Sequence, residues 1–293
     1  MTAPAARDGG AGTYYDRPVI AAPVWKPTIA VYLFAGGLAG ASAGLGLVAR
    51  LRGNHRLARS CRLATIAGLA ASPALLIEDL GRPERFHHML RVFKVTSPMS
   101  VGTWILTGFG ALAGAGAASE MTGIARPLGR AADAGAAALG MPLATYTAAL
   151  LADTSTPVWH QGRRHLPFLF AAGSAASAGA MAALVTPAED GAMASRLAAG
   201  GAIAEAVLAE AMKRTAGEAA RPYRAGPAAV MARAASALLM GGAAALAAGT
   251  TGRRRPWARP ATMAGALSVL TGSLLERFAV WRAGTESARQ TVR

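Results

Sequence analysis

The sequence predicts an all-α integral membrane protein with about eight transmembrane helices in two four-helix halves. Only 15% of its 293 residues are charged and 53% are hydrophobic, whereas soluble domains carry about 25% charged residues. The charges gather in short clusters between long apolar stretches. A stretch of about 18 or more apolar residues is long enough to cross a bilayer.

Eight apolar segments follow one another along the chain. They run over residues 27–49, 63–80, 99–119, 133–152, 166–186, 193–212, 226–249 and 260–281. They divide the chain into a polar N-terminal segment (1–26), a first half (27–160), a second half (161–285) and a polar tail (286–293). The first 16 residues are polar, so we expect no cleaved signal peptide. An even number of spans places both termini on one side of the membrane.

The first segment contains a glycine repeat. Gly36, Gly40 and Gly44 recur every four residues and share one helix face. This spacing allows two helix backbones to approach closely in a membrane.

The formal net charge of +15 is best explained by basic connectors that face anionic lipid headgroups. We therefore expect membrane lipid, and no nucleic acid, as a partner. A single cysteine, Cys61, is too few for an iron–sulfur cluster held by this chain alone. A haem inside the bundle needs histidine ligands within helices. No haem is expected, because all five histidines fall in connectors or at segment ends, namely His55, His87, His88, His160 and His165.

The connector after the second segment is the richest in chemistry-bearing residues. The segment ends in two carboxylates, Glu78 and Asp79, and the chain turns at Gly81-Arg82-Pro83. A short amphipathic piece follows, in which basic residues alternate with Phe86, Met89, Leu90 and Phe93. Such a piece lies along the membrane interface rather than across it.

Several stretches of this chain resemble the NrfD/polysulfide-reductase membrane subunits. They are Pro23-Val-Trp-Lys, Gly36-Gly-Leu-Ala-Gly, Asp79-Leu-Gly-Arg-Pro, Met89-Leu-Arg-Val-Phe-Lys, Thr96-Ser-Pro-Met-Ser, Gly102-Thr-Trp, Tyr146-Thr-Ala-Ala-Leu-Leu and Pro157-Val-Trp. The motifs cover the chain through about residue 160. The resemblance implies a quinone-interacting anchor in a bacterial inner membrane. It also implies a four-cluster iron–sulfur partner that is bound to a molybdopterin-type catalytic subunit, as in a formate dehydrogenase or polysulfide reductase.

Within this resemblance, one membrane face collects the candidate site. A quinone (menaquinone or ubiquinone) needs hydrogen-bond donors to its carbonyls and a group nearby that exchanges protons. The candidate quinone-binding residues are Tyr32, Trp104, Tyr146 and Asp153, and the candidate proton-exchanging residues are Glu78 and Asp79. Lys26, Arg82, Arg85, Arg91 and Lys94 form the candidate docking surface for the partner.

Each of these residues also has a simpler interpretation. Asp79 and Arg82 can form an ion pair at a helix end, and the basic residues can be solvated anchors. The aromatic residues Tyr14, Tyr15, Trp25, Trp104 and Trp159 can belong to the belts that flank a membrane.

The second half contains one acid in the middle of a span, Glu205, where an ionisable group is costly. Arg233 reaches nearly the same depth in the next span. We expect Glu205 to face Arg233 with Glu210 nearby, either as a structural pair or on a proton path. On its own, the chain is expected to catalyse nothing. The alternative functions are a small-solute transporter and a passive anchor that binds no quinone.

Overall fold

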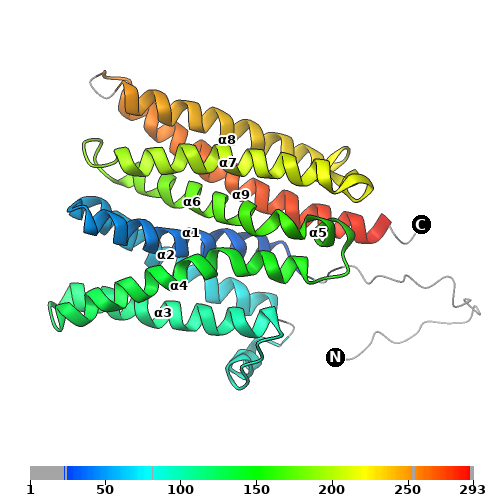
Figure 1. The fold of residues 1–293 in the computed structure, drawn as a ribbon, viewed down its shortest axis with the longest axis horizontal. Helices are drawn as coiled ribbons and strands as arrows, with labels where there is room; N and C mark the ends of the chain where they lie inside the picture. Colours follow the sequence, from blue (N-terminus) through cyan, green and yellow to red (C-terminus); the bar gives the residue numbers. More distant parts are fainter. Residues whose placement is uncertain (1–22, 24, 81, 253–254, 291–293) are drawn as a thin grey trace, which may run out of the picture.

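The computed structural model describes residues 23, 25–80, 82–252 and 255–290, and these residues form helices and connectors with no strand (Figure 1). Within that part, eight helices are long and apolar enough to span a membrane. They are α1 (Thr28–Leu51), α2 (His55–Asp79), α3 (Pro98–Thr122), α4 (Arg126–Ala152), α6 (Leu166–Val185), α7 (Ala192–Thr215), α8 (Pro227–Thr251) and α9 (Ala258–Gln290). The predicted fold class is thereby confirmed. Most of the predicted N-terminal segment, with Tyr14 and Tyr15, lies outside the described residues.

Short helices fill three connectors. These are η2 (Pro83–Leu90), α5 (Pro157–Gln161) with η3 (Gly162–Arg164), and η4 (Gly217–Tyr223). Pro83 and Pro157 stand in the first turns of η2 and α5, where proline sacrifices no intrahelical hydrogen bond.

Some helices extend beyond the apolar segments that marked them. Helix α2 begins at His55 because the Asn54 side chain accepts a hydrogen bond from the Leu57 amide at 3.0 Å and caps the helix. Helix α9 continues to Gln290, so the start of the predicted polar tail is helical. Hydropathy marks the apolar part of a span, whereas capping decides where the helix begins.

The helices form two groups, α1–α4 and α6–α9, in one bundle (Figure 1). Helix α6 joins the groups, because it packs against both α1 and α4. Helix α1 also contacts α9. The first and second halves therefore share a central seam of helices.

Of the three glycines in the α1 repeat, Gly40 makes the close helix–helix contact. A Cβ on Gly40 would lie 2.3 Å from the Gly140 carbonyl oxygen of α4, and a Cβ on Gly140 would lie equally close to Gly40. Gly36 has more room, and nothing lies within 4 Å of a Cβ on Gly44. The two helices cross at the Gly40–Gly140 contact, where neither residue can carry a side chain without moving a backbone.

Candidate functional site

Two predicted quinone-binding residues meet inside the bundle. Tyr32 begins the second turn of α1, and Tyr146 lies six residues before the end of α4. Their hydroxyls are hydrogen-bonded to each other, and Tyr32 is only 1% exposed. Gly102 of α3 leaves room for the Tyr146 ring, since a Cβ there would lie 1.9 Å from a ring carbon. We call the end of the bundle that holds this pair the tyrosine end, and the opposite end, where Arg50 lies in the last turn of α1, the arginine end.

The predicted carboxylates lie at the tyrosine end and contact Lys26. The Lys26 amide donates to the Asp79 carboxylate at 2.9 Å, and the Lys26 ammonium donates to the Glu78 carbonyl at 2.9 Å. These bonds hold the end of α2 against the start of α1, roughly 9 Å along the helix axis from Tyr32. Asp79 is thus tied to Lys26 rather than to Arg82, and the exposed Glu78 carboxylate remains open to solvent.

The other two predicted quinone-binding residues are not brought to the tyrosine pair. Trp104 is 40% exposed and packs edge-on against Phe93, with its indole N–H directed at the Val92 carbonyl at 3.5 Å. Asp153 directly follows α4 and lines a separate open cavity of about 660 Å³ with His160.

Residues 82–95 form an exposed basic and apolar connector, which we call the strap. Its four cations, Arg82, Arg85, Arg91 and Lys94, are exposed, and their side chains make no ion pair within the described residues. Phe93 is 60% exposed beside them. Partial desolvation and the positive charges of Arg91, His87 and Arg85 lower the pKa of His88. These neighbouring cations therefore disfavour protonation of His88.

Trp159 is a buried structural residue, which corrects its assignment to an interfacial belt. It is 1% exposed, stacks on Trp25 at 5.4 Å, and donates its indole N–H to the Val280 carbonyl at 2.8 Å. A Cβ on Gly284 would lie 2.0 Å from the indole ring. Trp159 therefore joins the first half to α9 at the tyrosine end.

The predicted pairing of Glu205 with Arg233 is wrong. Glu205 is fully buried and lies 3.8 Å from the guanidinium of Arg277 on α9, while Ser273 donates to its carboxylate at 3.1 Å. Arg233 is exposed on α8, and the exposed Glu210 pairs with Arg214 at 3.0 Å. Depth alone cannot identify the partner, because Arg233 has the right depth on the wrong helix face.

The Glu205–Arg277 pair belongs to a larger buried cluster. Arg277 donates to the Phe170 carbonyl at 3.1 Å, and its guanidinium lies 4.0 Å from the centre of the Phe170 ring. The neighbouring Glu276 is also fully buried, and within the described residues neither of its carboxylate oxygens has a hydrogen-bond partner. Burial, and then the charge of Glu276, raise the pKa of Tyr223 in η4.

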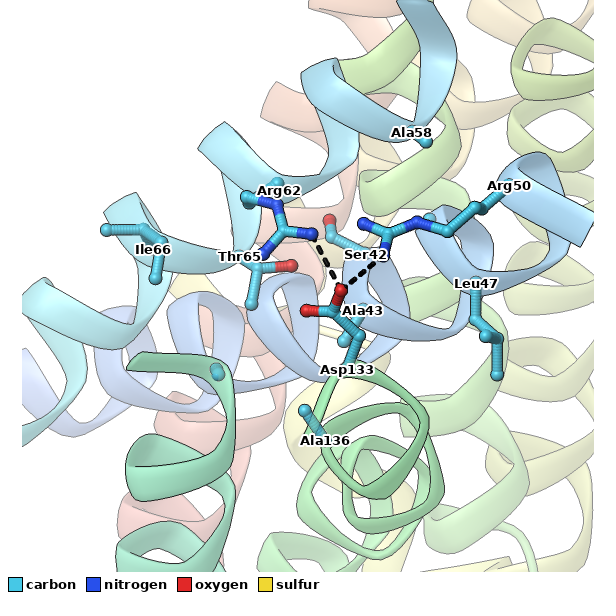
Figure 2. A pocket seen from close by; sticks show the side chains of 12 residues that line it. Ser42, Ala43, Leu47, Arg50, Ala58, Arg62, Thr65, Ile66, Asp133 and Ala136 are labelled. Atoms are coloured by element: carbon cyan, nitrogen blue, oxygen red, sulfur yellow. Dashed lines mark hydrogen bonds and ion pairs between the residues drawn. The ribbon is translucent and has the colours of Figure 1, made fainter. Parts of the chain in front are cut away.

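A second charged cluster lies at the arginine end. Asp133 of α4 accepts from Arg50 of α1 at 2.5 Å and from Arg62 of α2 at 2.7 Å (Figure 2). Glu120 of α3 contacts Arg62 at 2.7 Å and Arg50 at 3.7 Å. Two carboxylates and two guanidiniums, one group from each of the four helices, thus close this end of the first half.

A comparison with known families identifies the chain. The family model described as "Polysulphide reductase, NrfD" matches residues 18–286. The chain belongs to the NrfD family. Its members are membrane subunits of polysulfide reductase-like complexes and generally anchor redox subunits. A search of curated proteins finds no significant match.

Sequence reasoning missed several residues of this NrfD chain that the fold brings together. Arg277 was not considered as a partner of Glu205, although it is a cation inside the last apolar segment, residues 260–281. The sequence contains one indication of the cluster around Asp133. Its four charged residues fall near the ends of four successive spans at the same membrane face. Within the described residues, no group of three His, Cys, Asp or Glu side chains could hold a metal ion.

Proposed function

We propose that this chain is the subunit through which an oxidoreductase complex exchanges electrons with the quinone pool. The observation that carries the proposal is the Tyr32–Tyr146 hydroxyl pair, which lies one to two turns from one end of the spans, with Tyr32 buried and Tyr146 partly buried. A phenol hydroxyl can donate a hydrogen bond to a quinone carbonyl. Since the two hydroxyls bond to each other, an entering quinone would replace one hydroxyl as the hydrogen-bond partner of the other.

Reduction of a quinone to a quinol takes up two electrons and two protons, and quinol oxidation releases them. In this proposal the electrons pass to or from a four-cluster iron–sulfur subunit, itself bound to a molybdopterin-type catalytic subunit. The chain itself supplies the donors Tyr32 and Tyr146 and a route for protons at the tyrosine end. Glu78 is the better proton-exchanging group, because its carboxylate is exposed while that of Asp79 is bound to Lys26.

The strap is the proposed docking surface for the iron–sulfur partner. Its cations are exposed and unpaired within the described residues, and they lie at the same end as the tyrosine pair. Docking there would place a terminal cluster near the quinone. Complementary charge on the partner would steer association and would make it sensitive to salt.

The tyrosine pair is tested in the complex purified with its native partners. Tyr32→Phe and Tyr146→Phe should each lower kcat/KM for quinone about ten- to hundredfold, the loss expected when a buried hydroxyl partner is removed. Thr145→Val is the control, because the Thr145 hydroxyl bonds its own helix at the Met141 carbonyl. Partner retention should be unchanged in all three variants. Full quinone turnover in both tyrosine variants would instead indicate a passive anchor.

Docking is tested by the same purification. Arg85→Glu combined with Arg91→Glu should abolish co-purification of the iron–sulfur subunit while leaving thermal unfolding unchanged. The control combines Arg52→Glu with Arg196→Glu, which reverses two exposed arginines at the arginine end. Loss of the partner from the control, with retention in the strap variant, would place docking at the other face.

A further inference from the structure

The arginine end contains a basic cavity that the proposed quinone chemistry does not use. The cavity has a volume of about 740 Å³ and lies where α1, α2, α3 and α4 end or begin. Five arginines line it, against two carboxylates, Glu120 and Asp133. It shares Arg50, Ala58, Arg62 and Asp133 with the small inner pocket drawn in Figure 2.

The charges of the cavity fall into two layers. At the floor, Arg50 and Arg62 are neutralised by Asp133 and Glu120. At the mouth, Arg59, Arg126 and Arg130 are exposed, and within the described residues none of the three makes an ion pair or a side-chain hydrogen bond. Three guanidiniums that have no anionic partner within the described residues therefore line the same cavity.

The start of α4 adds to the positive potential of the mouth. The helix begins at Arg126, and no side chain caps its first turn, which contributes Arg126 and Gly129 to the cavity. Pro127 has no N–H and the Gly129 N–H donates to the Ala125 carbonyl, so the start of α4 favours an anion mainly through the helix dipole. This feature is independent of the arginine side chains and has the same sign.

Apolar side chains beside the mouth indicate the kind of anion. Leu51 lines the cavity and is 78% exposed, and Leu128, between Arg126 and Arg130, is 71% exposed. Ile124 in the adjoining connector is 70% exposed. A soluble anion would gain nothing from these residues. A phospholipid places its phosphate at the level of the arginines and its acyl chains along the apolar surface of the spans.

We propose that this cavity binds the phosphodiester headgroup of one anionic phospholipid, such as phosphatidylglycerol or cardiolipin. Arg59, Arg126 and Arg130 bind the phosphate oxygens, since a guanidinium matches the geometry of phosphate. The paired floor keeps the cavity open and limits how deeply the headgroup enters. The site is separate from the quinone-reactive end, so it holds whether or not quinone chemistry occurs there.

The test uses the full chain in zwitterionic detergent micelles and measures thermal unfolding and native mass spectra on addition of lipid. Cardiolipin or phosphatidylglycerol should stabilise the protein and remain bound at one lipid per chain, whereas phosphatidylcholine and inorganic phosphate should do neither. The combined variant Arg59→Gln, Arg126→Gln and Arg130→Gln should weaken anionic lipid binding at least tenfold. Its fold should persist, because these side chains have no protein partner to lose.

The matched control removes the same charge at the same membrane face but outside the cavity, by Arg52→Gln, Arg196→Gln and Arg255→Gln, three exposed arginines that make no ion pair within the described residues. It should retain the bound lipid. An equal loss in both triple variants would overturn the proposal in favour of diffuse attraction to headgroups, and so would equal binding of phosphatidylcholine. Stabilisation by inorganic phosphate alone would assign the cavity to a soluble anion. The single variant Arg130→Gln provides the same comparison with a smaller change.

Discussion

Arg277 is a charged residue buried in the interior of the bundle. Its guanidinium is 1% exposed and lies among Glu205, Glu276 and the Phe170 ring. Gly173 leaves the space for this arrangement, because a Cβ there would lie 2.3 Å from the Glu205 carboxylate and 2.6 Å from the guanidinium. Arg277 is therefore the counter-charge of Glu205, whereas Glu276 lies in the field of two cations, Lys213 first and Arg277 second.

Replacement of Arg277 alone should destabilise the protein more than replacement of Glu205 alone. Arg277→Gln removes the counter-charge of the buried Glu205 and leaves Glu276 with Lys213 alone, at a cost of about 3–5 kcal/mol in unfolding free energy. Glu205→Gln should cost less, since Glu276 remains beside Arg277. The double variant should regain part of the loss. Thermal unfolding in lipid nanodiscs would measure these differences.

Arg233→Gln is the control for this series, because Arg233 is exposed and makes no ion pair within the described residues. Its effect should stay within about 0.5 kcal/mol. A larger loss from Arg233→Gln than from Arg277→Gln would contradict the pairing described here. Changed quinone turnover with intact stability in Glu205→Gln would support the proton path that the sequence left open.

At the level of helices, α1 determines how closely the two tyrosines approach. It carries Tyr32 and crosses α4, which carries Tyr146, at the Gly40–Gly140 contact. A side chain at this crossing would separate the two helices about two turns from the hydroxyl pair. Close packing and the candidate site are thus linked through the same pair of helices.

Gly40→Ala should lower stability and also weaken quinone turnover, since α1 and α4 must move apart to admit the methyl group. Gly44→Ala is the matched control on the same helix, where a Cβ has free space. It should be neutral or slightly stabilising, because alanine is the better helix former. Comparable unfolding temperatures for the two variants would show that the crossing tolerates a side chain.

Hydropathy predicted the number and order of the spans because each must be apolar over the thickness of a bilayer. It could not predict which faces meet. Tyr32 and Tyr146 were expected near the same membrane face, and the facing sides of α1 and α4 bring their hydroxyls together. Trp104 was expected there too, but its ring packs against Phe93 instead. Glu205 was placed with Arg233 for the same reason. A single sequence predicts how deep a residue lies in the membrane. It does not predict which side chains meet, because that depends on how the helices rotate and cross.

At the level of the whole molecule, Trp159 connects the two halves at the tyrosine end. It reaches from the connector between the halves to the α9 backbone and fits against Gly284. Trp281 of α9 returns the contact by donating to the Trp25 carbonyl at 3.2 Å. The position of α9 is therefore coupled to the start of α1, which carries Tyr32.

Trp159→Ala should destabilise the protein by about 3–5 kcal/mol, the usual cost of truncating a buried tryptophan. It should also increase hydrogen exchange at the ends of α1 and α9, because the contact between the halves is lost. Trp257→Ala, at a tryptophan that is 48% exposed, should have a smaller and local effect. Unchanged exchange at the α1 end would show that the halves are held together elsewhere.

The bond between Tyr32 and Tyr146 has a consequence for the proposed quinone chemistry. A ligand can accept a hydrogen bond from either tyrosine only if the bond between the two hydroxyls breaks. The net binding energy is then a difference between two similar bonds, which keeps affinity modest. In the proposed function the product returns to the lipid at every cycle, so weak retention is an advantage, and the protein without a ligand keeps both hydroxyls hydrogen-bonded.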